Sequence, residues 1–208
     1  MVNSPAWRIS NVQVIGAHYL TSAQIVTAAR IVGDSPFAIP NQTVDRRVLA
    51  LGVPETVSVF YQLPNTAVIS VSERRPAYIW KVDPTLYLVA RDGTILGTTQ
   101  TATLSTLVVD VDHKPVKVGQ RIDPLVLQQA ETVLAVLPRI ISPAPDYLLH
   151  SQELGLIIPT GAIPEVVLGD GNLNAKLTIL RPVLQAALGA HPIPRLVDLR
   201  VPSHPYYR

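Results

Sequence analysis

The chain of 208 residues contains no cysteine, which excludes disulfide bonds, zinc–thiolate sites and thiol nucleophiles. Charge is sparse and nearly balanced: 17 Lys and Arg face 15 Asp and Glu, for a formal net charge of +2. That balance lacks the dense basic stripe that binding to nucleic acid requires. No apolar run approaches the roughly 18 residues that span a bilayer, and no signal peptide is recognisable.

Motifs for catalysis are also missing. The chain has no G-x-S-x-G, no P-loop and no G-x-G-x-x-G. Asp110, Asp112 and His113 form a candidate metal cluster, but on a strand the histidine would point away from the two carboxylates. The other histidines are scattered in predicted loops and strand ends. We therefore predict no enzymatic activity, no metal ion and no cofactor, and expect function to lie in surfaces.

The first 75 residues carry the pattern of a small α+β domain. Thr21-Ser22-Ala23-Gln24 is a capping box, and Ile25 and Ala29 follow it on one helical face. The two predicted helices are too short to be stable alone in water, so both are expected to pack on a three-stranded sheet. The expected elements are a strand over 7–16, helices from Thr21 and Asn41, and strands over 55–62 and 66–72.

The segment Glu73-Arg74-Arg75-Pro76 ends this pattern abruptly. Proline cannot donate to a strand ladder and biases the preceding residue toward extended geometry, so the chain is expected to turn here from one sheet into the next. We place a domain boundary between residues 1–75 and 76–208. Glu73, Arg74 and Arg75 form either a docking patch for a membrane-embedded partner or a salt-bridge cluster between the domains, and we favour the latter.

From Ala77 onward short strands predominate, with two helices among them. Asp123-Pro124 predicts one helix start, as an N-cap followed by proline at N1. The helix from Leu173 is expected to bury a stripe of Leu173, Leu177, Leu180, Leu184 and Leu188. Residues 195–201 predict a last long strand, after which the tail either adds a short edge strand or is loose. The other strands are expected over 77–82, 85–90, 93–97, 107–111, 145–150, 154–158 and 164–168.

Several fragments, in order along the chain, resemble the FtsQ/DivIB family of bacterial cell-division proteins. The opening is similar to the start of a polypeptide-transport-associated (POTRA) domain, and the junction is similar to the family's V-x-E-R-x-P-x motif. The opening fragments are Ile9-x-x-Val12-x-Val14-x-Gly16 and Leu20-Thr21-x-x-x-Ile25, and the junction is Val71-Ser72-Glu73-Arg74-Arg75-Pro76-Ala77. Three fragments near the end resemble further family signatures: Val167-Leu168-Gly169, Lys176-Leu177 and Val197-Asp198-Leu199-Arg200.

This resemblance implies a POTRA domain of order β-α-α-β-β followed by a larger mixed β domain with two packed helices. It further implies a non-enzymatic scaffold of the divisome, placed outside the cytoplasm at the division septum. A single transmembrane helix, absent from this chain, would tether it to the cell membrane. The implied partners are FtsB/DivIC-type and FtsL-type division proteins and, through them, the septal peptidoglycan synthase complex. The alternative is a POTRA module that handles polypeptides for an outer-membrane β-barrel.

The family resemblance implies a partner surface at the last strands. An edge strand exposes unpaired N–H and C=O groups that a partner strand can use, and Tyr and Arg are frequent interface anchors. The alternative is that Asp198 and Arg200, which are two residues apart, face solvent or pair with a neighbouring strand. The predicted partner-binding residues are Val197, Asp198, Leu199, Arg200, Val201, Tyr206 and Tyr207.

Overall fold

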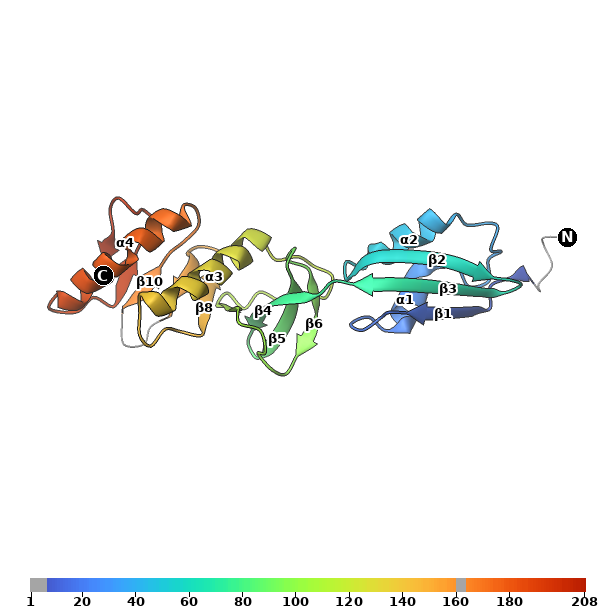
Figure 1. Cartoon of the computed structure of the whole chain (residues 1–208), viewed down its shortest axis with the longest axis horizontal. Helices are drawn as coiled ribbons and strands as arrows, with labels where there is room; N and C mark the ends of the chain where they lie inside the picture. Colours follow the sequence, from blue (N-terminus) through green and yellow to red (C-terminus); the bar gives the residue numbers. More distant parts are fainter. Residues whose placement is uncertain (1–6, 160–163) are drawn as a thin grey trace. The chain divides into compact units, whose positions relative to one another are not determined.

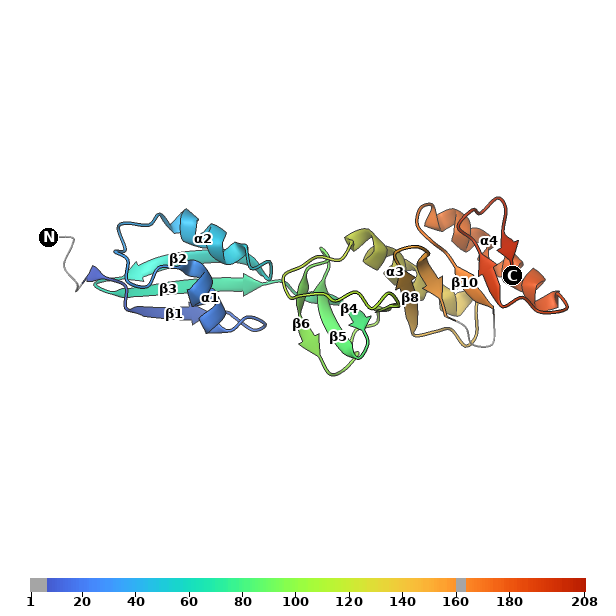
Figure 2. The same cartoon turned by 180° about the vertical axis from the view of Figure 1, so that it is seen from behind.

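A computed structural model describes residues 7–159 and 164–208 (Figures 1 and 2). The chain divides into two compact units. The first contains the residues up to Arg75 together with Thr94–Leu96 and Lys117–Gln120, and the second contains the others. No helix within the described residues is long and apolar enough to cross a membrane.

The first unit is a three-stranded sheet with two helices on one face (Figure 1). The sheet order is β1-β3-β2, in which β1 is parallel and β2 antiparallel to the central strand. This arrangement confirms the predicted strand-helix-helix-strand-strand order. Its elements are β1 (Asn11–Ile15), α1 (Ser22–Ala29), α2 (Asn41–Leu49), β2 (Pro54–Gln62) and β3 (Thr66–Glu73).

Local sequence signals set the helices of this unit. The Thr21 hydroxyl accepts a hydrogen bond from the Gln24 amide N–H at 3.2 Å, and the Gln24 side chain accepts from Thr21 N–H at 2.7 Å. The predicted capping box is therefore confirmed. The core is formed by Ile25 and Ala29 of α1, Val44 and Val48 of α2, and Ala67, Ile69 and Val71 of β3.

The second unit contains most of a nine-stranded mixed sheet, in the order β12-β11-β10-β9-β8-β7-β4-β5-β6. Two helices, α3 (Pro124–Val136) and α4 (Leu173–Gly189), and a short 3-10 helix, η2 (Leu137–Arg139), accompany it. The predicted α+β class is confirmed. The strands are β4 (Pro76–Val82), β5 (Thr85–Ala90), β6 (Ile95–Thr99), β7 (Leu107–Asp110), β8 (Tyr147–Ser151), β9 (Gly155–Ile158), β10 (Glu165–Val167), β11 (Leu196–Asp198) and β12 (Tyr206–Tyr207).

The two helices of the second unit were predicted with unequal success. Asp123 caps α3 as expected, because its carboxylate accepts from Leu125 N–H at 2.8 Å. The leucine stripe of α4 is wrong at both ends: Leu173 and Leu177 are half-buried and Leu188 is exposed. The face that packs inward is displaced by one position and includes a lysine. Its buried residues are Lys176, Leu180, Val183, Leu184 and Ala187.

The long strand predicted over 195–201 is also wrong. Strand β11 covers only Leu196–Asp198, because the Asp198 carboxylate accepts the main-chain N–H of Arg200 at 2.9 Å and turns the chain out of the sheet. The tail then returns as β12, antiparallel to β11, so Tyr206–Tyr207 forms the edge of the sheet. The sequence left two alternatives for the tail, a short edge strand or a loose segment, and the structure shows the edge strand.

Candidate functional site

The C-terminal edge of the nine-stranded sheet is the strand β12, where Tyr207 pairs with Val197 and Tyr206 with Asp198. Tyr206 is 61% exposed and Tyr207 is 41% exposed, whereas Val197 is fully buried. Residues paired across a ladder share a face, so the two tyrosines lie on opposite faces of the sheet. The edge therefore offers an aromatic side chain on each face.

The hydrogen-bond pattern between β12 and β11 determines which main-chain groups of β12 point away from the sheet. Arg208 and Leu196 exchange both bonds: Arg208 N–H donates to Leu196 O, and Leu196 N–H donates to Arg208 O, each at 3.0 Å. In an antiparallel ladder such pairs alternate with pairs that exchange no bond. Tyr207 therefore directs its N–H and C=O away from β11. These two groups are the main-chain partners that the C-terminal edge presents to another strand.

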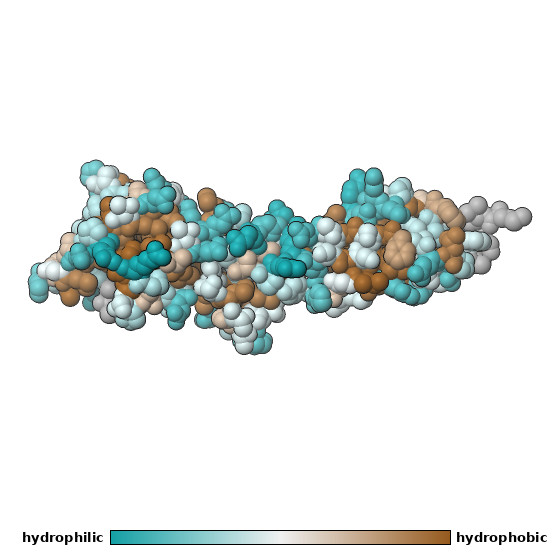
Figure 3. Space-filling model, in the orientation of Figure 1, coloured by the Kyte–Doolittle hydropathy of each residue, from teal (hydrophilic) through white to brown (hydrophobic). Residues whose placement is uncertain are grey.

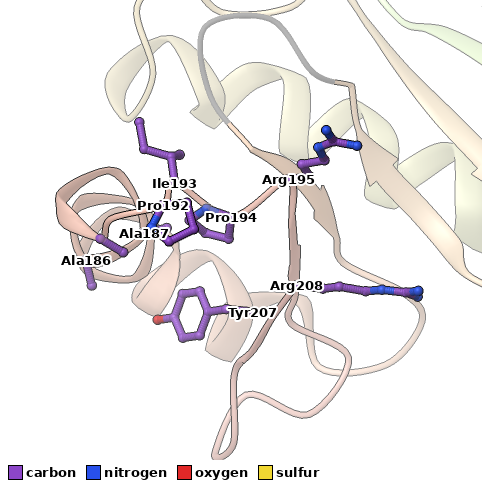
Figure 4. A pocket seen from close by; sticks show the side chains of 9 residues that line it. Ala186, Ala187, Pro192, Ile193, Pro194, Arg195, Tyr207 and Arg208 are labelled. Carbon is purple, nitrogen blue, oxygen red and sulfur yellow. The ribbon is translucent and has the colours of Figure 1, made fainter.

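A groove of about 640 Å³ adjoins this edge (Figure 4). Figure 4 shows the Tyr207 ring on the α4 side of β12 and the Arg208 side chain pointing the other way. The walls are mostly apolar, and Ile193 is 54% exposed within them. We call this the edge groove. It is lined by Ala186, Ala187, Ala190, Pro192, Ile193, Pro194, Arg195, Tyr207 and Arg208.

The side chain of Arg200 forms hydrogen bonds with a residue of its own chain. Its guanidinium donates to the Asp198 carboxylate, with Nη2 to Oδ2 at 2.7 Å and Nε to Oδ2 at 2.9 Å. This hydrogen-bonded partner holds the pKa of Asp198 below its ordinary value of 3.8. The aliphatic part of Arg200 lies over Gly169. Leu199 N–H donates to Val167 O at 2.8 Å, so two of the signature fragments are joined directly.

Lys176 adds the third signature fragment to this cluster. Its side chain is almost fully buried, and its ammonium donates to the main-chain carbonyl of Asp170. Burial lowers the pKa of Lys176, while the carboxylates of Asp170 and Asp198 act against that change. The segments around Gly169, Lys176 and Asp198 thus meet at the turn that connects β11 to the tail. The hydrophobic periodicity of α4 does not predict the burial of Lys176, because this pattern assigns every inward position of the helix to an apolar residue.

Glu73 and Arg74 belong to the other unit and bind its main chain. The Glu73 carboxylate accepts from the N–H groups of His18, Tyr19 and Leu20 at 2.7–3.0 Å, just before α1. Arg74 Nη1 donates to Gly52 O at 2.6 Å and also to Pro54 O. Arg75 is exposed. Among these three residues, Arg75 has the side chain most available to a partner.

The chain turns directly after Asp110, the last residue of β7. The Asp112 carboxylate accepts from Ser151 Oγ at 3.1 Å and from Gln152 N–H at 2.6 Å. The Asp110 carboxylate accepts from the main-chain N–H groups of Asp112 and Lys114. Across residues 7–159 and 164–208 there is no group of three or more His, Cys, Asp or Glu that could hold a metal ion. Both carboxylates therefore accept hydrogen bonds that stabilise the turns around them.

Comparison with known proteins matches the first unit to a domain family and nearly the whole chain to named relatives. A family model described as "POTRA domain, FtsQ-type" matches residues 7–74. Cell division protein FtsQ of Chloroflexus aurantiacus is 31% identical over 209 residues, which cover 99% of this chain and 75% of that protein. Cell division protein FtsQ of Chloroflexus aggregans is 28% identical over 208 residues, with the same coverage. The chain therefore belongs to the FtsQ family of cell-division proteins.

Proposed function

We propose that this protein is a non-enzymatic scaffold of the divisome that captures bitopic partners of the FtsB/DivIC and FtsL types by strand addition at the C-terminal edge. In this proposal a transmembrane helix outside the chain tethers it, and both units lie outside the cytoplasm at the septum. The partners connect it to the septal peptidoglycan synthase complex. The observation that carries the proposal is the outward N–H and C=O of Tyr207, next to an apolar groove.

The two parts of the site contribute to affinity in different ways. A strand that pairs with Tyr207 gains two main-chain hydrogen bonds, each worth about 0.5–1.5 kcal/mol net. An apolar side chain fully buried in the edge groove contributes about 1.5–3 kcal/mol. The two sources of affinity are therefore similar in size, and the main-chain bonds also fix the register of the partner strand. Tyr206, on the opposite face, adds an aromatic anchor of the kind enriched at interfaces.

Asp198 and Arg200 have a supporting role in this proposal. Their ion pair, together with the main-chain bond from Arg200 to Asp198, sets the turn from which the tail returns to β11. Val197 and Leu199 are buried beneath the edge, and Val201 is exposed in the turn. We propose that direct contact with the partner is made by Tyr206, Tyr207 and the edge groove, while residues 197–200 hold that edge in place.

We also propose that Glu73 and Arg74 act within their own unit, because both side chains bind its main chain. A second docking patch in this segment would then depend on Arg75. Charge reversal of Arg75 with unchanged recruitment of all partners would leave the segment with a structural role alone.

Photo-crosslinking in the native cell envelope tests the proposed function. A photoreactive residue at position 206 of the full-length protein should form adducts with small single-pass coiled-coil proteins, identified by mass spectrometry. The matched control is position 147, because Tyr147 is an exposed tyrosine within the same sheet, away from its edge. Adducts with an outer-membrane barrel or with unfolded polypeptides at position 206 would instead support the polypeptide-handling alternative.

A further inference from the structure

Exposed apolar side chains gather at one end of the first unit, far along the sequence from the C-terminal edge. Phe37 is 65% exposed, Val32 59% and Leu63 55%. Large apolar residues on separate loops are each unremarkable, but a contiguous exposed group marks an interaction surface. Together with Trp7, we call these residues the apolar tip.

Main-chain bonds bring the three loops of the apolar tip together. Ile9 N–H donates to Asp34 O at 2.9 Å, Gly33 N–H donates to Ile9 O at 2.8 Å, and Ser10 N–H donates to Asn65 O at 3.0 Å. The segment after Trp7 is therefore bonded to the loop that carries Val32 and Phe37 and to the turn that carries Leu63. The Trp7 and Phe37 rings are in contact, with centroids 6.3 Å apart.

This is the end at which the chain enters the first unit (Figure 1), and hydrophobic surface is visible on that unit in Figure 3. Residues 7–10, 32–39 and 62–65 include two charged side chains, Arg8 and Asp34, of opposite sign. Arg8 is directed to the main chain, with Nη1 donating to Gly33 O at 3.1 Å. The apolar tip therefore offers aromatic and aliphatic groups with little net charge.

We propose that the apolar tip lies on the surface of the lipid bilayer, with Phe37 and Leu63 inserted among the headgroups and Trp7 at the interface. Tryptophan favours this region of a membrane, and a few apolar side chains give weak, reversible attachment. The inference rests on the proposed function, with the membrane tether placed before Trp7 in the full-length protein, an arrangement that would bring this end of the first unit to the bilayer. Contact with lipid would hold the first unit against the membrane rather than leaving it on a free tether.

Tryptophan fluorescence provides a direct test. The chain has two tryptophans, and Trp80 Nε1 has no hydrogen-bond partner among residues 7–159 and 164–208. Trp80→Phe therefore leaves Trp7 as the single reporter without removing a bond within that part of the chain. The chain is titrated with vesicles of phosphatidylethanolamine and phosphatidylglycerol that carry brominated acyl chains. Trp7 emission should shift to the blue and be quenched. Raising NaCl from about 0.1 to 1 M should change the partition coefficient less than about twofold, because the apolar tip has little net charge.

Two substitutions provide a matched pair. Leu63→Ser should lower the partition coefficient about fivefold, and Phe37→Ser about tenfold, since each removes one inserted side chain. Ile15 is exposed to the same extent as Leu63, at 55%, but lies at the other end of β1. Ile15→Ser should leave the partition coefficient unchanged.

Three outcomes would overturn the lipid contact. They are no quenching at excess lipid, an equal loss in Ile15→Ser, and a blue shift that follows protein concentration without lipid, which would identify a second copy as the occupant. Crosslinking from position 206 is measured on the same chain in the cell envelope. If that crosslinking persists while vesicle binding fails, the lipid contact alone is wrong and the scaffold function stands.

Discussion

The side chain of Arg200 lies directly over Gly169: a Cβ atom added to that glycine would stand 2.6 Å from Arg200 Cγ. Arg200 is at the same time bound to Asp198, at the end of β11. The glycine therefore provides the space in which the arginine reaches across to fix the turn before the edge strand. The link between the two residues joins the Val167-Leu168-Gly169 fragment to the Asp198-Leu199-Arg200 fragment.

Gly169→Ala should destabilise the protein by about 2 kcal/mol, because it combines left-handed backbone strain with displacement of Arg200. Gly171 is the matched control. It also has a positive φ, +90° against +64°, but its added Cβ would meet nothing within 4 Å. Gly171→Ala should cost about 1 kcal/mol, from strain alone. Urea unfolding of the two variants measures the difference, and equal losses would show that the contact with Arg200 does not matter.

Asp198 should make stability depend on pH. Its native pKa lies below the ordinary value of 3.8, mainly because Arg200 donates to it, so the carboxylate stabilises the fold above that value. The stabilisation is lost as the pH falls from 3.8 through the lowered native pKa. Asp198→Asn should therefore cost about 1 kcal/mol at pH 7, and the difference from the unsubstituted protein should shrink in strong acid. Denaturant unfolding at pH 7 and at pH 2.5 tests this, and a constant difference would refute it.

Glu73 should stabilise the first unit through the three N–H groups that it binds before α1. Glu73→Ala leaves those donors without their carboxylate and should destabilise the protein by about 2 kcal/mol. Glu55→Ala, at an exposed glutamate of β2, is the control and should stay within about 0.5 kcal/mol. Thermal unfolding separates the two. If Glu73→Ala is as mild as the control, the carboxylate does not organise this loop.

Sequence reasoning succeeded where the signal is local. The Thr21–Gln24 capping box and the Asp123 cap each depend on a side chain and a main-chain group within three residues, so their geometry follows from the sequence. The order of elements in the first unit followed from the same kind of pattern. The resemblance to FtsQ/DivIB proteins rested on the order of short fragments, and the comparisons with known proteins confirm it.

Most of the features that the sequence did not predict have non-local causes. Lys176 is buried because its ammonium reaches the carbonyl of Asp170, a contact that hydrophobic periodicity does not represent. Glu73 binds the main chain of a loop more than fifty residues earlier, a contact that no local pattern represents. The early end of β11 does have a local signal, an aspartate two residues before the N–H that it captures, but the alternating apolar pattern of residues 195–201 outweighed it. The edge groove could not be predicted, because it is formed by segments from α4, the following turn and the tail.

The direction of the Tyr207 N–H allows strand addition to be tested by one pair of variants. Tyr207→Ala removes the side chain and keeps the N–H, while Tyr207→Pro removes both. Neither substitution removes a donor or an acceptor of the two bonds between Arg208 and Leu196. Affinity for a partner ectodomain, found by crosslinking from position 206, is measured by calorimetry, with circular dichroism to check folding. Strand addition predicts that Tyr207→Pro binds about tenfold more weakly than Tyr207→Ala, from the lost bond and the unpaired partner carbonyl. Equal affinity of two folded variants would contradict it.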